Sequence, residues 1–196
     1  MIFCWAVLIF TSGINIYILL AIFIAGASLL AYLIIFVPKF DYIQGRIFSF
    51  FNRETGTHNF QSDKAIESIT SGGFFGKGIG EGVLKNRVPE AHTDYIISVI
   101  SEEFGVVAIM LILLLFLILI YMVFKKISFE TNDKAKLILI GSISLILMQA
   151  TIHIGVNIRL FPTTGMTLPF LSYGGSSIVS TSILTGIILN LTKRKI

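Results

Sequence analysis

Ionisable side chains gather in residues 87–103, directly before the apolar run 104–124, which has no charged residue. Glu90, His92 and Asp94 lie close together in this stretch. Charged groups at a membrane boundary are costly unless they face a cavity, a partner or a pathway, so their clustering indicates a functional site. Carboxylates and imidazoles act as general acids and bases. Asp94 is therefore the first candidate for chemistry.

Asp94 and Thr93 also fit a structural role, because they precede an expected helix. Asp and Thr are preferred N-cap residues, whose side-chain oxygen accepts a backbone N–H, and the helix dipole favours a negative charge there. The spacing favours neither capping nor catalysis, and the two roles are compatible.

A second candidate is the glycine-rich segment Gly72–Gly82 (GGFFGKGIGEG). It has neither the P-loop pattern nor a strand leading into G-x-G-x-x-G, so a nucleotide site is not indicated. A flexible loop of this kind can approach a ligand closely, and neighbouring cations would suit a pyrophosphate. A solvated loop with lysines near lipid headgroups fits the spacing equally well. The neighbouring cations are Lys77, Lys85 and Arg87.

The composition indicates an integral membrane protein. Of 196 residues, 55% are hydrophobic and 13% charged, and the mean hydropathy is +0.88. The net charge of +4 is modest, and the basic residues form no stripe, which excludes nucleic acid as a partner. The single cysteine, Cys4, cannot form a disulfide framework or a cysteine metal site within the chain.

The apolar runs predict an all-α, polytopic helix bundle with about four full transmembrane helices and one partial helix. The run 1–10 is too short to cross a bilayer, which needs about 20 residues, and is interpreted as the end of a truncated span rather than a signal peptide. Residues 38–93 and 159–175 are expected to be external loops, the first with a short helix over 62–69. The full spans are expected at 14–37, 104–124, 137–158 and 176–191.

The third of these full spans contains four polar residues, which are expected mainly to hydrogen bond to neighbouring helices. Its histidine has no second histidine at metal-binding spacing. The four residues are Gln149, Thr151, His153 and Asn157.

Basic residues predict the orientation of the chain. The lysine-containing link 125–136 and the basic residues 193–195 are separated by two spans, so both are expected on the cytoplasmic side. The two long loops are then external, and Asp94 and Arg159 face the same outer surface.

Three segments together closely resemble the SEDS family of cell-wall polymerases (FtsW/RodA/SpoVE). They are Gly72–Gly82, Pro89–Tyr95 (PEAHTDY) and Pro162–Ser177 (PTTGMTLPFLSYGGSS), and the resemblance covers essentially the whole chain. It is closer to the division branch, FtsW, than to the elongation branch, RodA. Thr164 departs from the division-type motif, which has a lysine there, and Arg159 stands where a small or apolar residue is expected. The family has ten transmembrane helices, so the chain is similar to its C-terminal half.

The resemblance implies a peptidoglycan glycosyltransferase that polymerises lipid II during cell division. Asp94 matches the family's catalytic aspartate and would accept the proton of the acceptor 4-hydroxyl as it attacks the donor's anomeric carbon. Undecaprenyl pyrophosphate would leave, stabilised by basic residues or by a Mg²⁺ or Mn²⁺ ion. The residues expected to bind substrate are Glu90, His92, Lys77, Lys85, Arg87, Arg159, Ser172 and Ser176.

The resemblance also implies a place and partners: the bacterial inner membrane, with a cytoplasmic C-terminus, lipid II as substrate, and a class B penicillin-binding protein transpeptidase with other divisome proteins. A separate N-terminal half is a further expected partner. Two alternatives stay open. One is a lipid II transporter, in which the polar residues of the third span line a path and Asp94 only binds. The other is an inactive truncated or split-gene product.

Overall fold

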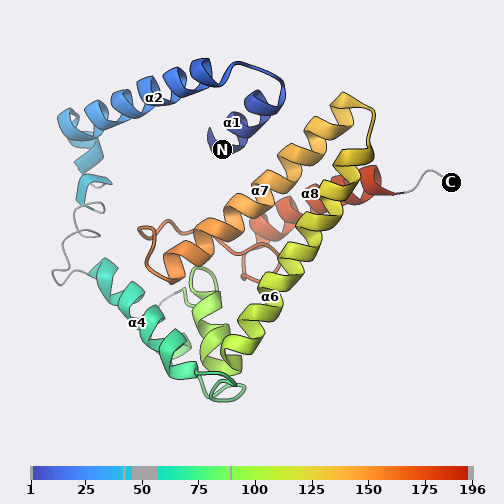
Figure 1. Cartoon of the computed structure of the whole chain (residues 1–196). Helices are drawn as coiled ribbons and strands as arrows, with labels where there is room; N and C mark the ends of the chain where they lie inside the picture. The colour runs from blue at the N-terminus through green and yellow to red at the C-terminus, as the bar shows by residue number, and fades with distance from the viewer. Residues whose placement is uncertain (1, 42, 46–56, 89, 194–196) are drawn as a thin grey trace.

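The computed structural model is all-helical over the residues it describes, and Figure 1 shows the arrangement of the helices. The described residues are 2–41, 43–45, 57–88 and 90–193. Parts of the expected external loop, residues 42, 46–56 and 89, and the basic residues 194–195 lie outside them. The helices are α1 (Ile2–Thr11), α2 (Ile16–Phe36), η1 (Pro38–Phe40), α4 (Thr57–Gly72), α5 (Leu84–Arg87), α6 (Ile96–Phe129), α7 (Asp133–Asn157) and α8 (Gly175–Thr192).

Four helices, α2, α6, α7 and α8, are long and apolar enough to cross a membrane. The predicted all-α, polytopic membrane architecture is therefore confirmed. Helices α6, α7 and α8 pack together around a core formed by Val123, Leu139, Ile143, Ile146 and Ile188. Helix α1 packs on α7, whereas α2 contacts only α1 and η1 among the described elements and stands apart from the bundle (Figure 1).

Helix α6 starts at Ile96, before the span expected at 104–124, and bends at Gly105 (φ 77°, ψ −175°). The part before the bend is helical although it contains buried polar residues, among them Ser98 and Glu102. Ser98 and Glu102 find hydrogen-bond partners within the protein, so the helix continues there without an apolar sequence. Hydropathy alone could not locate this start.

The glycine-rich segment packs directly on the backbone of α6 at the bend. A Cβ on Gly76 would lie 2.1 Å from a backbone oxygen of α6, and a Cβ on Gly105 would lie 2.2 Å from the backbone oxygen of Phe74. The backbone N–H of Lys77 donates to the Glu102 carbonyl at 2.9 Å. The glycines therefore serve a close approach of two backbones, and the segment is not a freely solvated loop.

Helix α4 covers the N-terminal part of α6 and is longer than the helix expected at 62–69. It buries Ala65 in a small core with residues of α5, α6 and α7, including Leu84, Val99 and Val156. Within the described residues, much of the expected external loop is thus a folded cap over the start of α6. This cap presents the turn that contains Asp94.

Candidate active site

Asp94 lies in a tight turn between α5 and α6. The backbone N–H groups of Thr93 and Asp94 both donate to the Glu90 carbonyl, each at 3.0 Å, and Glu90 has a positive φ of 62°. Helix α6 has Tyr95 at its N-cap, with no side-chain cap bond, and the Thr93 hydroxyl donates to the Glu90 carbonyl at 2.9 Å. Capping by Thr93 or Asp94, one of the two predicted roles, is therefore wrong.

The Asp94 side chain is half-buried and faces the loop that follows α7. A Cβ on Gly165 would lie 3.6 Å from Asp94 Oδ2. The carboxylate makes no hydrogen bond or ion pair with the residues that the structure describes. Burial, and to a smaller extent the charge of Glu90, raises the pKa of Asp94 above its ordinary value. A carboxylate of this kind is suited to accept a proton from a bound molecule.

Helix α7 fixes the main chain of this turn through Asn157. Its Nδ2 donates to the Asp94 carbonyl at 3.0 Å, and its Oδ1 accepts from the Ser98 hydroxyl at 2.7 Å. Ser172, in the loop after α7, donates its hydroxyl to the Thr93 carbonyl at 2.7 Å. The main chain of Thr93 and Asp94 is therefore held from two directions.

The loop facing Asp94 is held by the same face of α7. His153 Nδ1 lies 2.7 Å from the Met166 carbonyl, and Gln149 Nε2 donates to the Thr167 hydroxyl at 3.1 Å. Gln149 Nε2 also donates to the Ser177 hydroxyl of α8 at 3.2 Å, so the predicted bond to a neighbouring helix is confirmed for Gln149, whereas His153 bonds to the loop. Thr151 bonds to neither, because its hydroxyl donates to the Leu147 carbonyl within α7.

The two serines expected to bind substrate have different surroundings. Ser172 is buried, and besides donating to Thr93 it accepts the Leu168 N–H at 2.8 Å, so it supports the turn. Ser176 is exposed at the start of α8. Its neighbour Ser177 accepts a hydrogen bond from the Thr167 hydroxyl at 2.7 Å and thereby joins the loop to α8.

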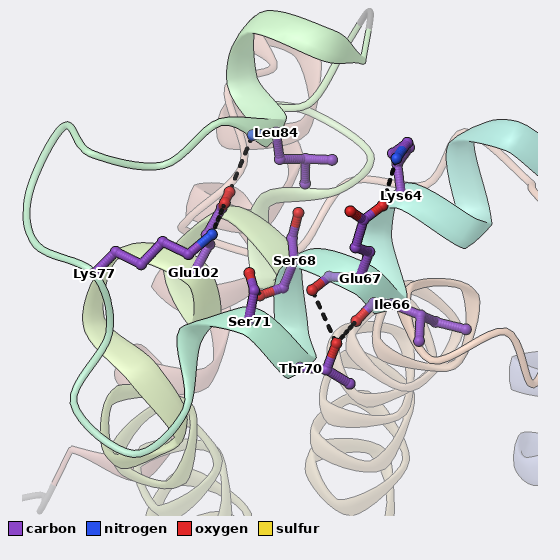
Figure 2. Close-up of polar contacts among 9 residues, drawn as sticks. All are labelled: Lys64, Ile66, Glu67, Ser68, Thr70, Ser71, Lys77, Leu84 and Glu102. Carbon is purple, nitrogen blue, oxygen red and sulfur yellow. Dashed lines mark hydrogen bonds and ion pairs between the residues drawn. The ribbon is translucent and has the colours of Figure 1, made fainter.

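Two of the predicted pyrophosphate-binding cations are paired with acids of the protein. Lys77 Nζ lies 2.8 Å from Oε1 of the buried Glu102, whose Oε2 accepts the Leu84 N–H at 3.0 Å, as Figure 2 shows. Arg159 forms an ion pair with Asp63 of α4. Neither acid is near its partner in the sequence, so the pairing could not be foreseen. Lys77 and Arg159 are therefore not free cations.

The remaining predicted residues are Glu90, His92, Arg87 and Lys85. Glu90, His92 and Arg87 are exposed, and Arg87 lines a polar pocket of about 210 Å³ between α4, α5 and the glycine-rich segment. Lys85 is part of α5, but its side chain lies outside the described part of the chain. Among the described residues, no group of three or more His, Cys, Asp or Glu side chains could hold a metal ion.

Sequence reasoning missed the contributions of Asn157, Gly165 and Ser98 to the site. Asn157 was expected mainly to join helices, and the other two had no assigned role. One signal was available, because Gln149, His153 and Asn157 are spaced by four residues and so share one face of a helix. This spacing indicates a common polar neighbour.

Comparisons with known proteins agree with this architecture. A family model described as "Cell cycle protein" (FTSW_RODA_SPOVE) matches residues 1–196. The chain is 37% identical over 183 residues to the probable peptidoglycan glycosyltransferase FtsW of Enterococcus hirae, covering 88% of this chain and 46% of that protein. It is 39% identical over 158 residues to the protein of the same name from Caulobacter vibrioides, covering 80% and 40%.

A solved structure has a similar fold. The fold is similar, with a TM-score of 0.76 and 26% identity, to a chain of a structure described as "Structural coordination of polymerization and crosslinking by a peptidoglycan synthase complex". That match covers 95% of this chain and 52% of the other. The chain thus spans about half the length of the proteins it matches. It belongs to the FtsW/RodA/SpoVE family of cell cycle proteins and is a multi-pass membrane protein.

Proposed function

We propose that the chain contains the catalytic base of a peptidoglycan glycosyltransferase that polymerises lipid II. The observation that supports this is the environment of Asp94. Its carboxylate is half-buried, has a raised pKa and makes no hydrogen bond with the described residues, and its main chain is held by Asn157 of α7. The relatives named above are probable peptidoglycan glycosyltransferases, and the solved complex concerns polymerization and crosslinking.

In the proposed reaction, the acceptor's 4-hydroxyl lies beside Asp94 Oδ2. The carboxylate accepts the hydroxyl proton while the oxygen bonds to the donor's anomeric carbon, and the bond to undecaprenyl pyrophosphate breaks with its electron pair. Gly165 contributes by leaving open the space beside Oδ2 that a side chain would fill. Partial burial strengthens the interaction between the carboxylate and the hydroxyl.

The leaving pyrophosphate requires positive charge. Because Lys77 and Arg159 are paired with acids, we assign this role to the exposed Arg87 and to Lys85. A Mg²⁺ or Mn²⁺ ion would supply the same charge. Such ions are commonly bound by one or two carboxylates together with substrate phosphates, and the exposed Glu90 beside Asp94 suits that role.

We further place the chain in the bacterial inner membrane, with the Asp94 turn outside and the C-terminus in the cytoplasm. The basic link between α6 and α7 and the basic residues after α8 support this orientation, because two spans separate them. A class B penicillin-binding protein is the proposed partner, since the similar solved complex couples polymerization to crosslinking. Activity is proposed for the chain together with the other half of the fold.

Lipid II transport is less well supported. A transport path through the third span would need its polar side chains to face the substrate. His153 and Asn157 are instead buried, at 1% and 0% exposure, and bonded to the site loop and turn. These contacts favour a supporting role for both side chains.

The proposed function is tested by adding lipid II in detergent to the chain co-expressed and co-purified with the part of the Enterococcus hirae relative that this chain does not match. Product length is measured on a gel, and the full-length relative is the positive control. We expect glycan strands, which disappear in Asp94→Asn and persist in the control Thr151→Val. Movement of lipid II across vesicle membranes without any polymer would instead support transport. Neither polymer nor lipid II movement would support an inactive truncated or split-gene product.

A further inference from the structure

The turn that presents Asp94 depends on one completely buried amide from another helix. Asn157 is 0% exposed and makes four hydrogen bonds. Its Oδ1 accepts from the N–H and the hydroxyl of Ser98 at 3.2 and 2.7 Å, and its Nδ2 donates to the carbonyls of Asp94 and His153 at 3.0 and 2.8 Å. All donors and acceptors of the amide are thus used, which fixes its orientation.

The same helix face also sets the opposite wall of the site. His153, one turn before Asn157, lies 2.7 Å from the carbonyl of Met166, the residue after Gly165. Gly165 in turn faces Asp94 Oδ2. Adjacent turns of α7 therefore hold both the Asp94 main chain and the loop opposite its carboxylate by hydrogen bonds.

The Asp94 carboxylate has no hydrogen bond of its own to the described residues, so its position follows from where the main chain is held. We propose that Asn157 is a positioning residue for Asp94. It fixes the distance between the carboxylate and the Gly165 loop, and it keeps the carboxylate half-buried. The catalytic consequence of this inference rests on the proposed function, whereas the positional one does not. A displacement of about 1 Å at a reacting group can lower the rate by about 10²-fold.

Two readouts test the positioning role. The first is kcat and KM for lipid II polymerisation in the co-purified complex. The second uses the chain alone in detergent and measures the pH at which a hydrophobic carbodiimide modifies half of Asp94, followed by mass spectrometry of the peptide. The variants are Asn157→Ala and Ser98→Ala. Ser98→Ala removes one of the four hydrogen bonds of the Asn157 amide, the bond from the Ser98 hydroxyl. Thr151→Val, an exposed position on the same helix, is the matched control.

For Asn157→Ala we expect kcat to fall by about 10²-fold with KM nearly unchanged. The carbodiimide midpoint should move down toward the ordinary Asp value of about 3.9, because the released turn exposes the carboxylate to water. Ser98→Ala should lower kcat and the carbodiimide midpoint in the same way but by less. Thr151→Val should leave kcat and the midpoint unchanged. In an Asp94→Asn background, Asn157→Ala should lower the rate no further.

A folded Asn157→Ala variant with the wild-type kcat and midpoint would overturn the positioning role. If Asn157→Ala does not fold, Ser98→Ala decides in the same way, with wild-type values again contradicting the inference. If Asp94→Asn keeps full polymerisation, the proposed function fails, and the carbodiimide midpoint still decides whether Asn157 positions the carboxylate.

Discussion

Removing the charge of Lys77 should destabilise the protein more than removing the charge of Glu102, although the two side chains form one ion pair. Glu102 is 2% exposed, whereas the Lys77 side chain is 36% exposed. In Lys77→Met the carboxylate stays buried and loses its counter-ion, keeping its hydrogen bonds from backbone N–H groups such as that of Leu84. In Glu102→Gln the amide oxygen can still accept that N–H, and the lysine can turn toward water.

The magnitudes follow from this difference in burial. Breaking a fully buried pair from one side costs about 3–5 kcal/mol. Because Lys77 is partly exposed, water screens the pair, and we expect about 2–3 kcal/mol for Lys77→Met. For Glu102→Gln, which loses one charged hydrogen bond and buries no charge, we expect about 1 kcal/mol. The double variant should resemble Glu102→Gln, since it contains no unpaired buried charge.

The assay is thermal unfolding of the detergent-solubilised chain, followed by loss of the monodisperse peak of a fluorescent fusion. The partly exposed pair Lys126–Glu130 at the C-terminal end of α6 provides a control, because water screens it and Lys126→Met should change stability much less than Lys77→Met. Equal destabilisation by Lys77→Met and Glu102→Gln would refute the reasoning. So would a double variant that is less stable than Lys77→Met.

Four further predictions concern the bend, the titration of Asp94 and the orientation. Gly105→Ala should prevent stable folding, because the new Cβ would lie 2.2 Å from the Phe74 carbonyl at a φ of 77°, and expression as a monodisperse species measures this. The pKa of Asp94 is raised by burial and by Glu90, so Glu90→Gln should move the acid limb of the polymerisation rate to lower pH. The same raised pKa makes ionisation of Asp94 cost stability as pH rises above about 3.9, so Asp94→Asn should gain stability relative to wild type at neutral pH and lose that gain in acid. A membrane-impermeant thiol reagent should label Lys85→Cys from outside but not Asp133→Cys, in a background without the native cysteine, and the reverse pattern would contradict the orientation.

The membrane architecture could be predicted because long apolar runs are a strong signal. The ends of the helices could not be predicted where polar residues continue a helix inside the protein. Helix α6 starts at Ile96 because Glu102 and Ser98 are bonded to residues distant in sequence. Such partners are invisible to a hydropathy window of one segment.

For the site, a charged cluster at a membrane boundary and the family resemblance both point to Asp94, and its catalytic role stays a prediction. The ion pairs of the surrounding cations could not be predicted. Lys77 and Arg159 are basic residues in loops, yet each is paired with an acid on another element, Glu102 and Asp63. Composition and spacing identify charges but not which charges meet.

The most direct test of Asp94 as the proton acceptor is the polymerisation rate of Asp94→Asn in the co-purified complex, with Asp94→Ala alongside. Because the side chain caps no helix, both variants should fold like the wild type. Both rates should fall by about 10²–10⁴-fold, the usual effect of losing a positioned base. Near-normal polymerisation by folded Asp94→Asn would contradict the account, and Glu90, the other carboxylate of the turn, would become the candidate base.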